Sequence, residues 1–367
     1  MSDSTRVVLL SLDSFQHDAI TPELTPSLWN LAKRGGMAPD GGRCDLPSVT
    51  YVSHATLATG THPATHRLRT NRAARPTPGA IPGWAGADRV RVPTLFDAMH
   101  AAGLPAASVC GDQYLVRIME AERGGTAWPP GGVLPPGTAT CASGYAANAA
   151  VRGPLLDAVK DPRLALIFGH FNEVDTLGHH FGPDDRRTLD GYRGTDRLVG
   201  ESIEALEPDW RRTVLIVLSD HGMELVTGEP VDLRRLDPEG LVIAEIVNDG
   251  GAALVRLGAT TTVEAAGDWL RSIEGVAGCE VIGEDVLLVA GAPGAVFSSG
   301  STKHNVGMHG GPGATRTLAI VGGGHPVVKS VAADIARRPP HLADWAPTIA
   351  AILGAAMPTA EGRNLAS

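Results

Sequence analysis

Residues 6–13, RVVLLSLD, predict a buried strand, because residues 7–12 are apolar except for one serine and an acidic residue follows directly. Residues 25–36, TPSLWNLAKRGG, predict the helix that comes next. Thr25 is a candidate N-cap, Pro26 suits the first helical position, and two glycines end the helix. A strand and then a helix, with an acidic residue at the carboxyl end of the strand, form the first unit of a doubly wound α/β sheet.

The same alternation continues along the chain. Helical patterns separate further apolar runs, and the clearest of these runs is TVLIVL at residues 213–218. We therefore expect a mostly parallel central sheet that is covered by helices. Besides the first strand, the expected strands of this sheet are residues 106–110, 163–171, 213–218 and 317–323.

Two segments and one region depart from this pattern. Residues 67–92 and 124–137 are rich in proline and glycine and are expected to form loops. Between residues 228 and 297, short strand patterns surround a single helix, which predicts a small α+β cap insertion. The predicted core is therefore made of residues 1–227 and 298–367.

Composition limits the kind of partner and compartment. The 367-residue chain has a net charge of −9, which argues against binding of a nucleic-acid polymer but not against a small phosphate substrate. Its four cysteines are widely spaced, so reduced thiols and a cytoplasmic location are expected. No apolar stretch is long enough to cross a membrane. The abundance of alanine, glycine and proline is typical of a bacterial protein, and the sequence leaves a homodimer open.

Residues 46–66, LPSVTYVSHATLATGTHPATH, contain a turn, a helix start rich in hydroxyl groups, and a glycine that ends the helix. A helix N-terminus favours an anion through its free backbone N–H groups, so a nucleophile for phosphate chemistry would be well placed here. Several hydroxyl groups compete for that role, and each one could instead be an ordinary N-cap. The competing residues are Ser48, Thr50, Ser53 and Thr56.

Acidic and histidine residues recur in four separate blocks, each just past a strand or in a glycine-rich loop. Carboxylates and imidazoles are suitable ligands for zinc or a similar divalent ion, and the carboxyl ends of parallel strands bring such residues together. Any one block alone would more often be structural, whereas their joint occurrence is specific. The blocks are Asp13, Asp175 with His179, Asp220 with His221, and His309.

These blocks resemble the alkaline phosphatase superfamily, and most closely its type I phosphodiesterase/nucleotide pyrophosphatase branch, with phosphonoacetate hydrolase as a relative. The motifs that carry the resemblance are SLDSF, PSVTYVSHATLATG, NEVDTLGHHFGP, SDHGM and GMHGG. The resemblance implies a three-layer α/β/α sandwich of the alkaline phosphatase type. It also implies a metal-dependent hydrolase that cleaves phosphate diester or pyrophosphate bonds through a covalent phospho-threonine on Thr50.

Two divalent metal ions follow from the same resemblance, with zinc expected and manganese or iron as alternatives. One ion would be held by Asp175, His179 and His309. The other would be held by Asp13, Asp220 and His221, with the Thr50 oxygen between metal and substrate. Two such ions can clamp an in-line displacement at phosphorus.

The resemblance implies that the substrate is a small phosphate- or phosphonate-containing molecule. The alternatives remain a phosphonate hydrolase, a phosphomonoesterase or a non-catalytic phosphate-binding relative. Residues 111–114 lack a lysine that some relatives carry, which favours a diester. Ser53 lies where nucleotide-cleaving relatives have an asparagine, and Asn71 is a candidate by analogy with phosphonate-cleaving relatives. His304 is the third candidate for a substrate contact, as a leaving-group acid or a residue that supports His309.

Overall fold

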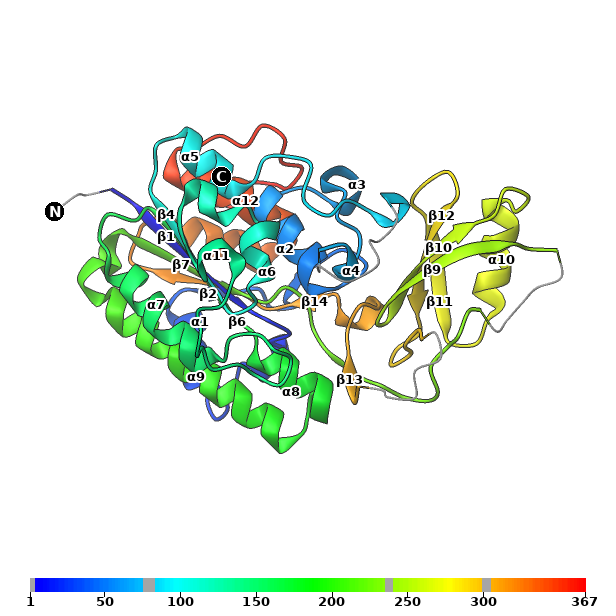
Figure 1. The fold of residues 1–367 in the computed structure, drawn as a ribbon. Helices are drawn as coiled ribbons and strands as arrows, with labels where there is room; N and C mark the ends of the chain where they lie inside the picture. The colour runs from blue at the N-terminus through cyan, green and yellow to red at the C-terminus, as the bar shows by residue number, and fades with distance from the viewer. Residues whose placement is uncertain (1–3, 75–82, 235–239, 299–304) are drawn as a thin grey trace.

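The computed structural model describes residues 4–74, 83–234, 240–298 and 305–367. Two parts are visible in Figure 1: a large α/β body and a smaller sheet with one helix beside it. Within the described residues, no helix has both the length and the apolar composition needed to span a membrane.

The large body is built on a seven-stranded sheet with the order β2-β15-β7-β1-β6-β4-β5. Strands β7, β1, β6, β4 and β5 run parallel, whereas β15 pairs antiparallel with both β7 and β2. The mostly parallel α/β sheet predicted from the sequence is thereby confirmed. Its strands are β1 (Arg6–Leu12), β2 (Gly36–Met37), β4 (Ala106–Cys110), β5 (Gly125–Trp128), β6 (Leu166–Phe171), β7 (Thr213–Leu218) and β15 (Ala319–Gly323).

Helices cover both faces of this sheet and give the three layers (Figure 1). In β1, Val7 and Leu9 point to one core, and Val8 and Leu10 point to the other, as alternation along a strand requires. Strand β1 lies between two other strands and is fully buried, which explains its continuous apolar sequence. One face carries α2 (Thr50–Thr59), α5 (Leu95–Ala101), α6 (Tyr114–Ile118), α11 (Val328–Arg337) and α12 (Leu342–Leu353); the other carries α1 (Pro26–Arg34), α7 (Asn148–Lys160), α8 (Glu173–Phe181) and α9 (Arg186–Leu206).

The smaller part is an antiparallel sheet of four strands, in the order β11-β12-β10-β9, with helix α10 (Val263–Ser272) packed on one face. All of these elements lie within the predicted cap region. The other face of the four-stranded sheet contacts the large body through a small apolar cluster that includes Ala85 and Leu254. The strands are β9 (Ile243–Asp249), β10 (Ala252–Leu257), β11 (Val276–Val281) and β12 (Val286–Gly291).

One expectation about the sheet was wrong. Residues 124–137 were expected to form a loop, but β5 begins at Gly125 and forms the edge of the sheet. This strand has only four residues and pairs with β4 alone, so little of its sequence must be apolar. A short edge strand that begins with glycine leaves almost no periodic signal.

A series of hydrogen-bonded polar side chains fixes the segment after α2. The His66 side chain is fully buried in α3 (Pro63–His66), where its Nδ1 atom accepts a hydrogen bond from the backbone N–H of Leu68 at 3.2 Å. Its Nε2 atom lies 3.1 Å from Thr56 Oγ1, which donates to Asp45 at 3.2 Å. Burial lowers the pKa of His66 from 6.5 to about 4, so the folded state holds this imidazole neutral.

This lowered pKa predicts a loss of stability in acid. Between pH 6.5 and 4 the unfolded chain binds a proton at His66 and the folded chain does not, so stability falls as the pH falls. The shift corresponds to about 3 kcal/mol across that window. The asparagine side chain of His66→Asn can still accept the hydrogen bond from Leu68 N, but it does not titrate. Between pH 6.5 and 4, the unfolding free energy of this variant should therefore fall by about 3 kcal/mol less than that of the wild type. Urea denaturation of metal-free protein from pH 7.5 to 4 measures both slopes, and equal slopes would contradict this role.

Candidate functional site

Acidic residues gather at the carboxyl ends of the central strands. Asp13 directly follows β1 and donates its backbone N–H to Phe171 O of β6 at 2.9 Å. Asp220 lies two residues beyond β7, and Asp175 lies in the first turn of α8, just after β6. Because β6, β1 and β7 are adjacent and parallel, their carboxyl ends bring these three carboxylates to one place.

The first predicted metal group, Asp175, His179 and His309, comes together in the structure. Its three ligand atoms lie within 4.8 Å of one another. The Nε2 atoms of the two histidines are 3.1 Å apart, and Asp175 Oδ1 lies 3.4 Å from the first and 3.5 Å from the second. The Nδ1 atoms of His179 and His309 face the carbonyl oxygens of Gly307 and Ser48, at 2.9 and 3.2 Å. Carbonyl oxygens only accept, so each Nδ1 carries the hydrogen and each Nε2 presents a lone pair.

The second predicted group, Asp13, Asp220 and His221, also comes together. His221 Nε2 lies 3.2 Å from Asp220 Oδ2, 3.6 Å from Asp13 Oδ1 and 3.2 Å from the Thr50 hydroxyl. Asp13 and His221 also form a cluster with Asp175, again within 4.8 Å. Asp175 therefore lies between the two groups, which makes them parts of one centre.

Several observations fit divalent cations at this centre. Among the described residues, the buried atoms Asp13 Oδ1 and Asp220 Oδ2 have no hydrogen-bond partner. Burial raises the pKa of Asp13 well above its usual range, and the carboxylates of Asp220 and Asp175 raise it further. Uncompensated buried carboxylates are unfavourable, whereas a cation among oxygen and imidazole ligands compensates them. The donor set thus suits divalent ions that prefer carboxylate and imidazole ligands.

The environment of each hydroxyl group separates Thr50 from its neighbours. Thr50 is the first residue of α2, and its Oγ1 faces His221. Ser48 donates to Gly311 O at 2.8 Å and accepts from Gly310 N at 3.2 Å, so its hydroxyl is engaged in fixing the loop that carries His309. The Thr56 hydroxyl is engaged with Asp45 and His66, as described above. The position of Thr50 is therefore the one suited to attack, and its role as nucleophile stays a prediction.

The three candidates for substrate contact differ in position. Asn71 lines the cavity beside the metal groups, where its Oδ1 accepts from Tyr51 N at 2.8 Å. Ser53 is only 1% exposed and does not line this cavity. Its hydroxyl lies beside the buried thiol of Cys44. His304 falls outside the described residues.

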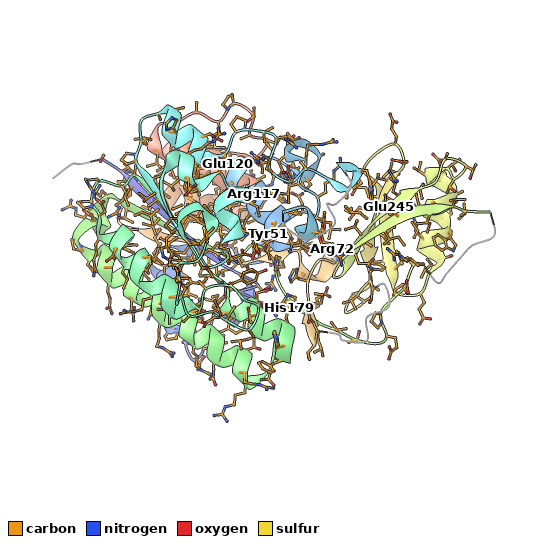
Figure 2. All side chains as sticks on the ribbon, viewed as in Figure 1. Tyr51, Arg72, Arg117, Glu120, His179 and Glu245 are labelled. Carbon is orange, nitrogen blue, oxygen red and sulfur yellow. The ribbon has the colours of Figure 1, made fainter. Side chains whose placement is uncertain are left out.

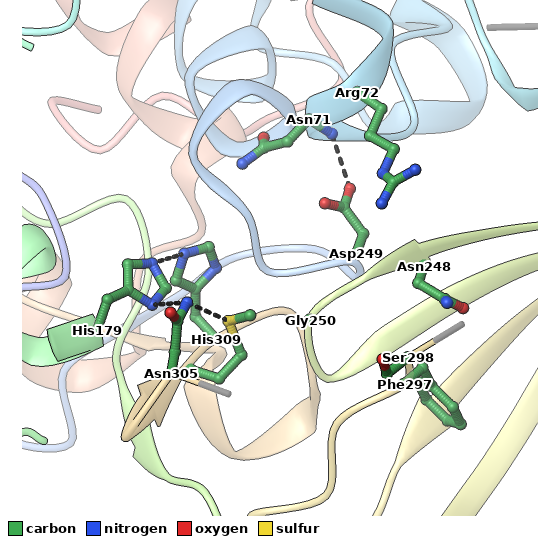
Figure 3. Close-up of a pocket in the computed structure, with 11 residues that line it drawn as sticks. Asn71, Arg72, His179, Asn248, Asp249, Gly250, Phe297, Ser298, Asn305 and His309 are labelled. Atoms are coloured by element: carbon green, nitrogen blue, oxygen red, sulfur yellow. Dashed lines mark hydrogen bonds between the residues drawn. The ribbon is translucent and has the colours of Figure 1, made fainter. Parts of the chain in front are cut away.

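This cavity has a volume of about 340 Å³ and lies at the junction between the large body and the four-stranded sheet. Figure 2 shows Arg72 and His179, which both line this cavity, near that junction. In Figure 3 the two histidines of the first group lie on one side, and Asn248 and Asp249, at the end of β9, lie on the other. Asp249 Oδ2 accepts from the backbone N–H of Asn71 at 2.7 Å. Sequence reasoning missed Asn248 and Asp249, because no motif surrounds them.

Two buried histidines outside the predicted ligand groups orient the centre. His170 Nδ1 accepts from Asp112 N at 3.3 Å, so its Nε2–H donates to Asp13 Oδ2 at 3.2 Å and leaves Oδ1 for a cation. His54 Nδ1 donates to Thr50 O at 2.8 Å, one helical turn away. Burial lowers the pKa of both histidines, so both are neutral. The four-residue spacing from Thr50 to His54 is the sequence signal of this contact.

Comparisons with known proteins point to one family. The family model of type I phosphodiesterase / nucleotide pyrophosphatase matches residues 7–268. An uncharacterized pyrophosphatase/phosphodiesterase of Schizosaccharomyces pombe is 28% identical over 234 residues, which cover 59% of this chain and 44% of that protein. A bis(5'-adenosyl)-triphosphatase of Xenopus laevis is 25% identical over 232 residues, covering 60% of this chain and 48% of that protein. The aligned part thus spans less than half the length of these two curated relatives.

A similar fold is found in murine ectonucleotide pyrophosphatase / phosphodiesterase 5, solved as an inactive variant in complex with AMP. The TM-score is 0.72 at 14% identity, and the match covers 98% of this chain and 97% of that one. At this identity the likeness establishes the shared fold.

The shared position of Asp175 predicts unequal effects of ligand substitutions. His179→Ala should lower the metal content from about two ions per chain to about one, because His179 belongs to the first group only. Asp175→Asn should weaken both sites, because Asp175 belongs to both clusters. Elemental analysis after gel filtration in buffered zinc measures this. The exposed neighbour His180 is the matched control, and loss of metal in His180→Ala equal to that in His179→Ala would contradict the assignment.

Proposed function

The chain belongs to the type I phosphodiesterase/nucleotide pyrophosphatase family, and we propose that it hydrolyses phosphate diester or pyrophosphate bonds with Thr50 as the nucleophile. The observation that carries this proposal is the place of the Thr50 hydroxyl. It lies 3.2 Å from His221 Nε2, at the N-terminus of α2 and beside the two ligand groups.

The metal ions are part of the same proposal. Asp175, His179 and His309 would hold one ion, and Asp13, Asp220 and His221 the other, with zinc as the proposed element and manganese or iron as alternatives. When bound, two divalent ions would supply positive charge that favours ionisation of a nearby hydroxyl and stabilises charge on the phosphoryl oxygens.

The chain's own residues would orient the attack. His54 holds the Thr50 carbonyl, and Asn71 holds the N–H of Tyr51, so the first turn of α2 is fixed at both residues. The N-terminus of this helix favours the negative charge of a phosphoryl group. Thr50 Oγ1 would bond to phosphorus as the bond to the leaving-group oxygen breaks, and water would then hydrolyse the resulting phospho-threonine.

The charges around the cavity support a diester or pyrophosphate over a monoester. Among the described residues that line it, Arg72 is the cationic side chain that adds to the metal groups, and Asp249 adds a carboxylate. The phosphoryl group of a monoester carries two negative charges, whereas that of a phosphodiester, or an internal phosphate of a pyrophosphate, carries one, so a carboxylate that lines the cavity disfavours the monoester more. The leaving group would occupy the cavity between Asn71 and the end of β9, which suits a small polar molecule.

Substitution of Thr50 tests the nucleophile directly. Thr50→Ala should lower kcat on bis-p-nitrophenyl phosphate by at least about a thousandfold, because the phospho-threonine cannot form. Its metal content should stay near that of the wild type, since the other ligands remain. Thr50→Ser keeps a hydroxyl at the same place and is the matched control, with activity expected between the two. An active Thr50→Ala enzyme would contradict the proposal.

A substrate panel tests the proposed bond. Hydrolysis of bis-p-nitrophenyl phosphate, p-nitrophenyl phosphate, a dinucleoside polyphosphate and phosphonoacetate should be compared as kcat/KM on one preparation. We expect the diester and the dinucleotide to exceed the monoester and the phosphonate by at least about tenfold, because the phosphoryl group under attack carries one negative charge fewer. A reversed order would instead support a phosphomonoesterase or a phosphonate hydrolase.

A further inference from the structure

Ser14 occupies an unusual position at the centre of the site. It directly follows Asp13 and is fully buried, and its backbone has a φ of 56°. Residues other than glycine rarely adopt this left-handed conformation, and it persists where surrounding contacts hold it. The contacts that hold Ser14 in this conformation therefore indicate its role.

Those contacts reach both metal groups. Ser14 Oγ donates to Asp175 Oδ1 at 2.8 Å and lies 3.1 Å from His221 Nδ1. The same oxygen lies 3.5 Å from Gly222 O, a longer and weaker contact. The backbone N–H of Ser14 donates to Asp220 Oδ1 at 3.2 Å.

The positions of the hydrogens follow from the acceptors. His221 Nδ1 also faces Gly222 O at 3.0 Å, and a carbonyl only accepts, so Nδ1 carries the hydrogen. Ser14 Oγ then accepts from His221 and gives its own hydrogen to Asp175. His221 Nε2 is left with a lone pair that faces Asp13, Asp220 and the Thr50 hydroxyl.

We propose that Ser14 is a positioning residue that couples the two metal sites through one hydroxyl group. The hydroxyl orients Asp175 of the first group and holds His221 of the second in the tautomer that a metal ion requires. This inference rests on the two-metal assignment of the proposed function. Because both ligands depend on the same hydroxyl, its removal should weaken both sites together.

Two substitutions separate the hydroxyl from the backbone strain. Ser14→Gly removes the hydroxyl and also suits the left-handed backbone, whereas Ser14→Ala removes the hydroxyl and keeps the strain. Metal-free Ser14→Gly should therefore have a higher Tm than Ser14→Ala. Both variants should bind zinc at least about tenfold more weakly than the wild type, at both sites, as measured by competition with a chelator. Ser202→Ala, which removes a buried hydroxyl in α9, is the control and should bind zinc as the wild type does.

The outcomes distinguish this inference from the proposed function. If the wild type binds two ions and Ser14→Gly binds both with wild-type affinity, the inference is wrong and the proposed function stands. Weaker binding in Ser14→Ala alone would assign the effect to strain and would also overturn the inference. If the wild type binds fewer than two ions, the two-metal proposal fails, and this inference fails with it. Weaker binding at both sites in both variants supports the coupling.

Discussion

Burial of three carboxylates at the end of a parallel sheet is the constraint on which this structure depends. Asp13, Asp175 and Asp220 are 3%, 6% and 0% exposed, and their mutual repulsion disfavours the folded chain unless positive charge lies among them. The surrounding groups each reduce that repulsion or prepare for a cation. His170 donates to Oδ2 of Asp13, and the backbone N–H of Ser14 donates to Oδ1 of Asp220. The other oxygen of each carboxylate lies near His221 Nε2, at 3.6 and 3.2 Å. The apolar layers on both faces of β1 supply the stability that such a centre requires.

The sequence predicted the parts of this arrangement that follow from local patterns. Buried parallel strands leave continuous apolar runs, and an acidic residue at the end of such a run lies at the edge of the sheet where ligands gather. Asp13 and Asp220 could therefore be placed from their strands alone. The Asp175–His179 spacing of four residues indicated one helical face, and α8 confirms that helix. The resemblance to known motifs was needed to choose Thr50 among several hydroxyl groups.

The parts that could not be predicted depend on contacts between residues distant in sequence. The sequence around Ser14 does not indicate that its hydroxyl contacts Asp175 and His221, because a left-handed backbone at a serine has no sequence signal. The same holds for His170, whose partner lies 157 residues away in the chain. Strand β5 was not predicted for a related reason. It pairs with β4 alone, at the edge of the sheet, so its sequence does not need the continuous apolar run of a central strand. Asn248 and Asp249 are the last residues of a β-strand, and nothing in the strand's sequence indicates that its end faces the cavity.

The position of the four-stranded sheet in the chain explains how it reaches the site without disturbing the core. Strands β9–β12 come between β7 and β15 in the chain, and β7 and β15 are antiparallel neighbours in the central sheet. The chain therefore leaves the sheet at the end of β7 and re-enters it beside that point, at the start of β15. The turn after β9 packs directly on the loop that carries His309, and Gly251 N donates to His309 O at 2.8 Å. The approach is so close that a Cβ atom at Gly310, where φ is 107°, would lie 2.2 Å from Asp249 O. The backbone that presents Asp249 to the cavity is thus in contact with the backbone that presents a predicted metal ligand. A change in the sheet that alters the choice of leaving group must therefore preserve the His309 loop, which restricts how freely this segment can vary.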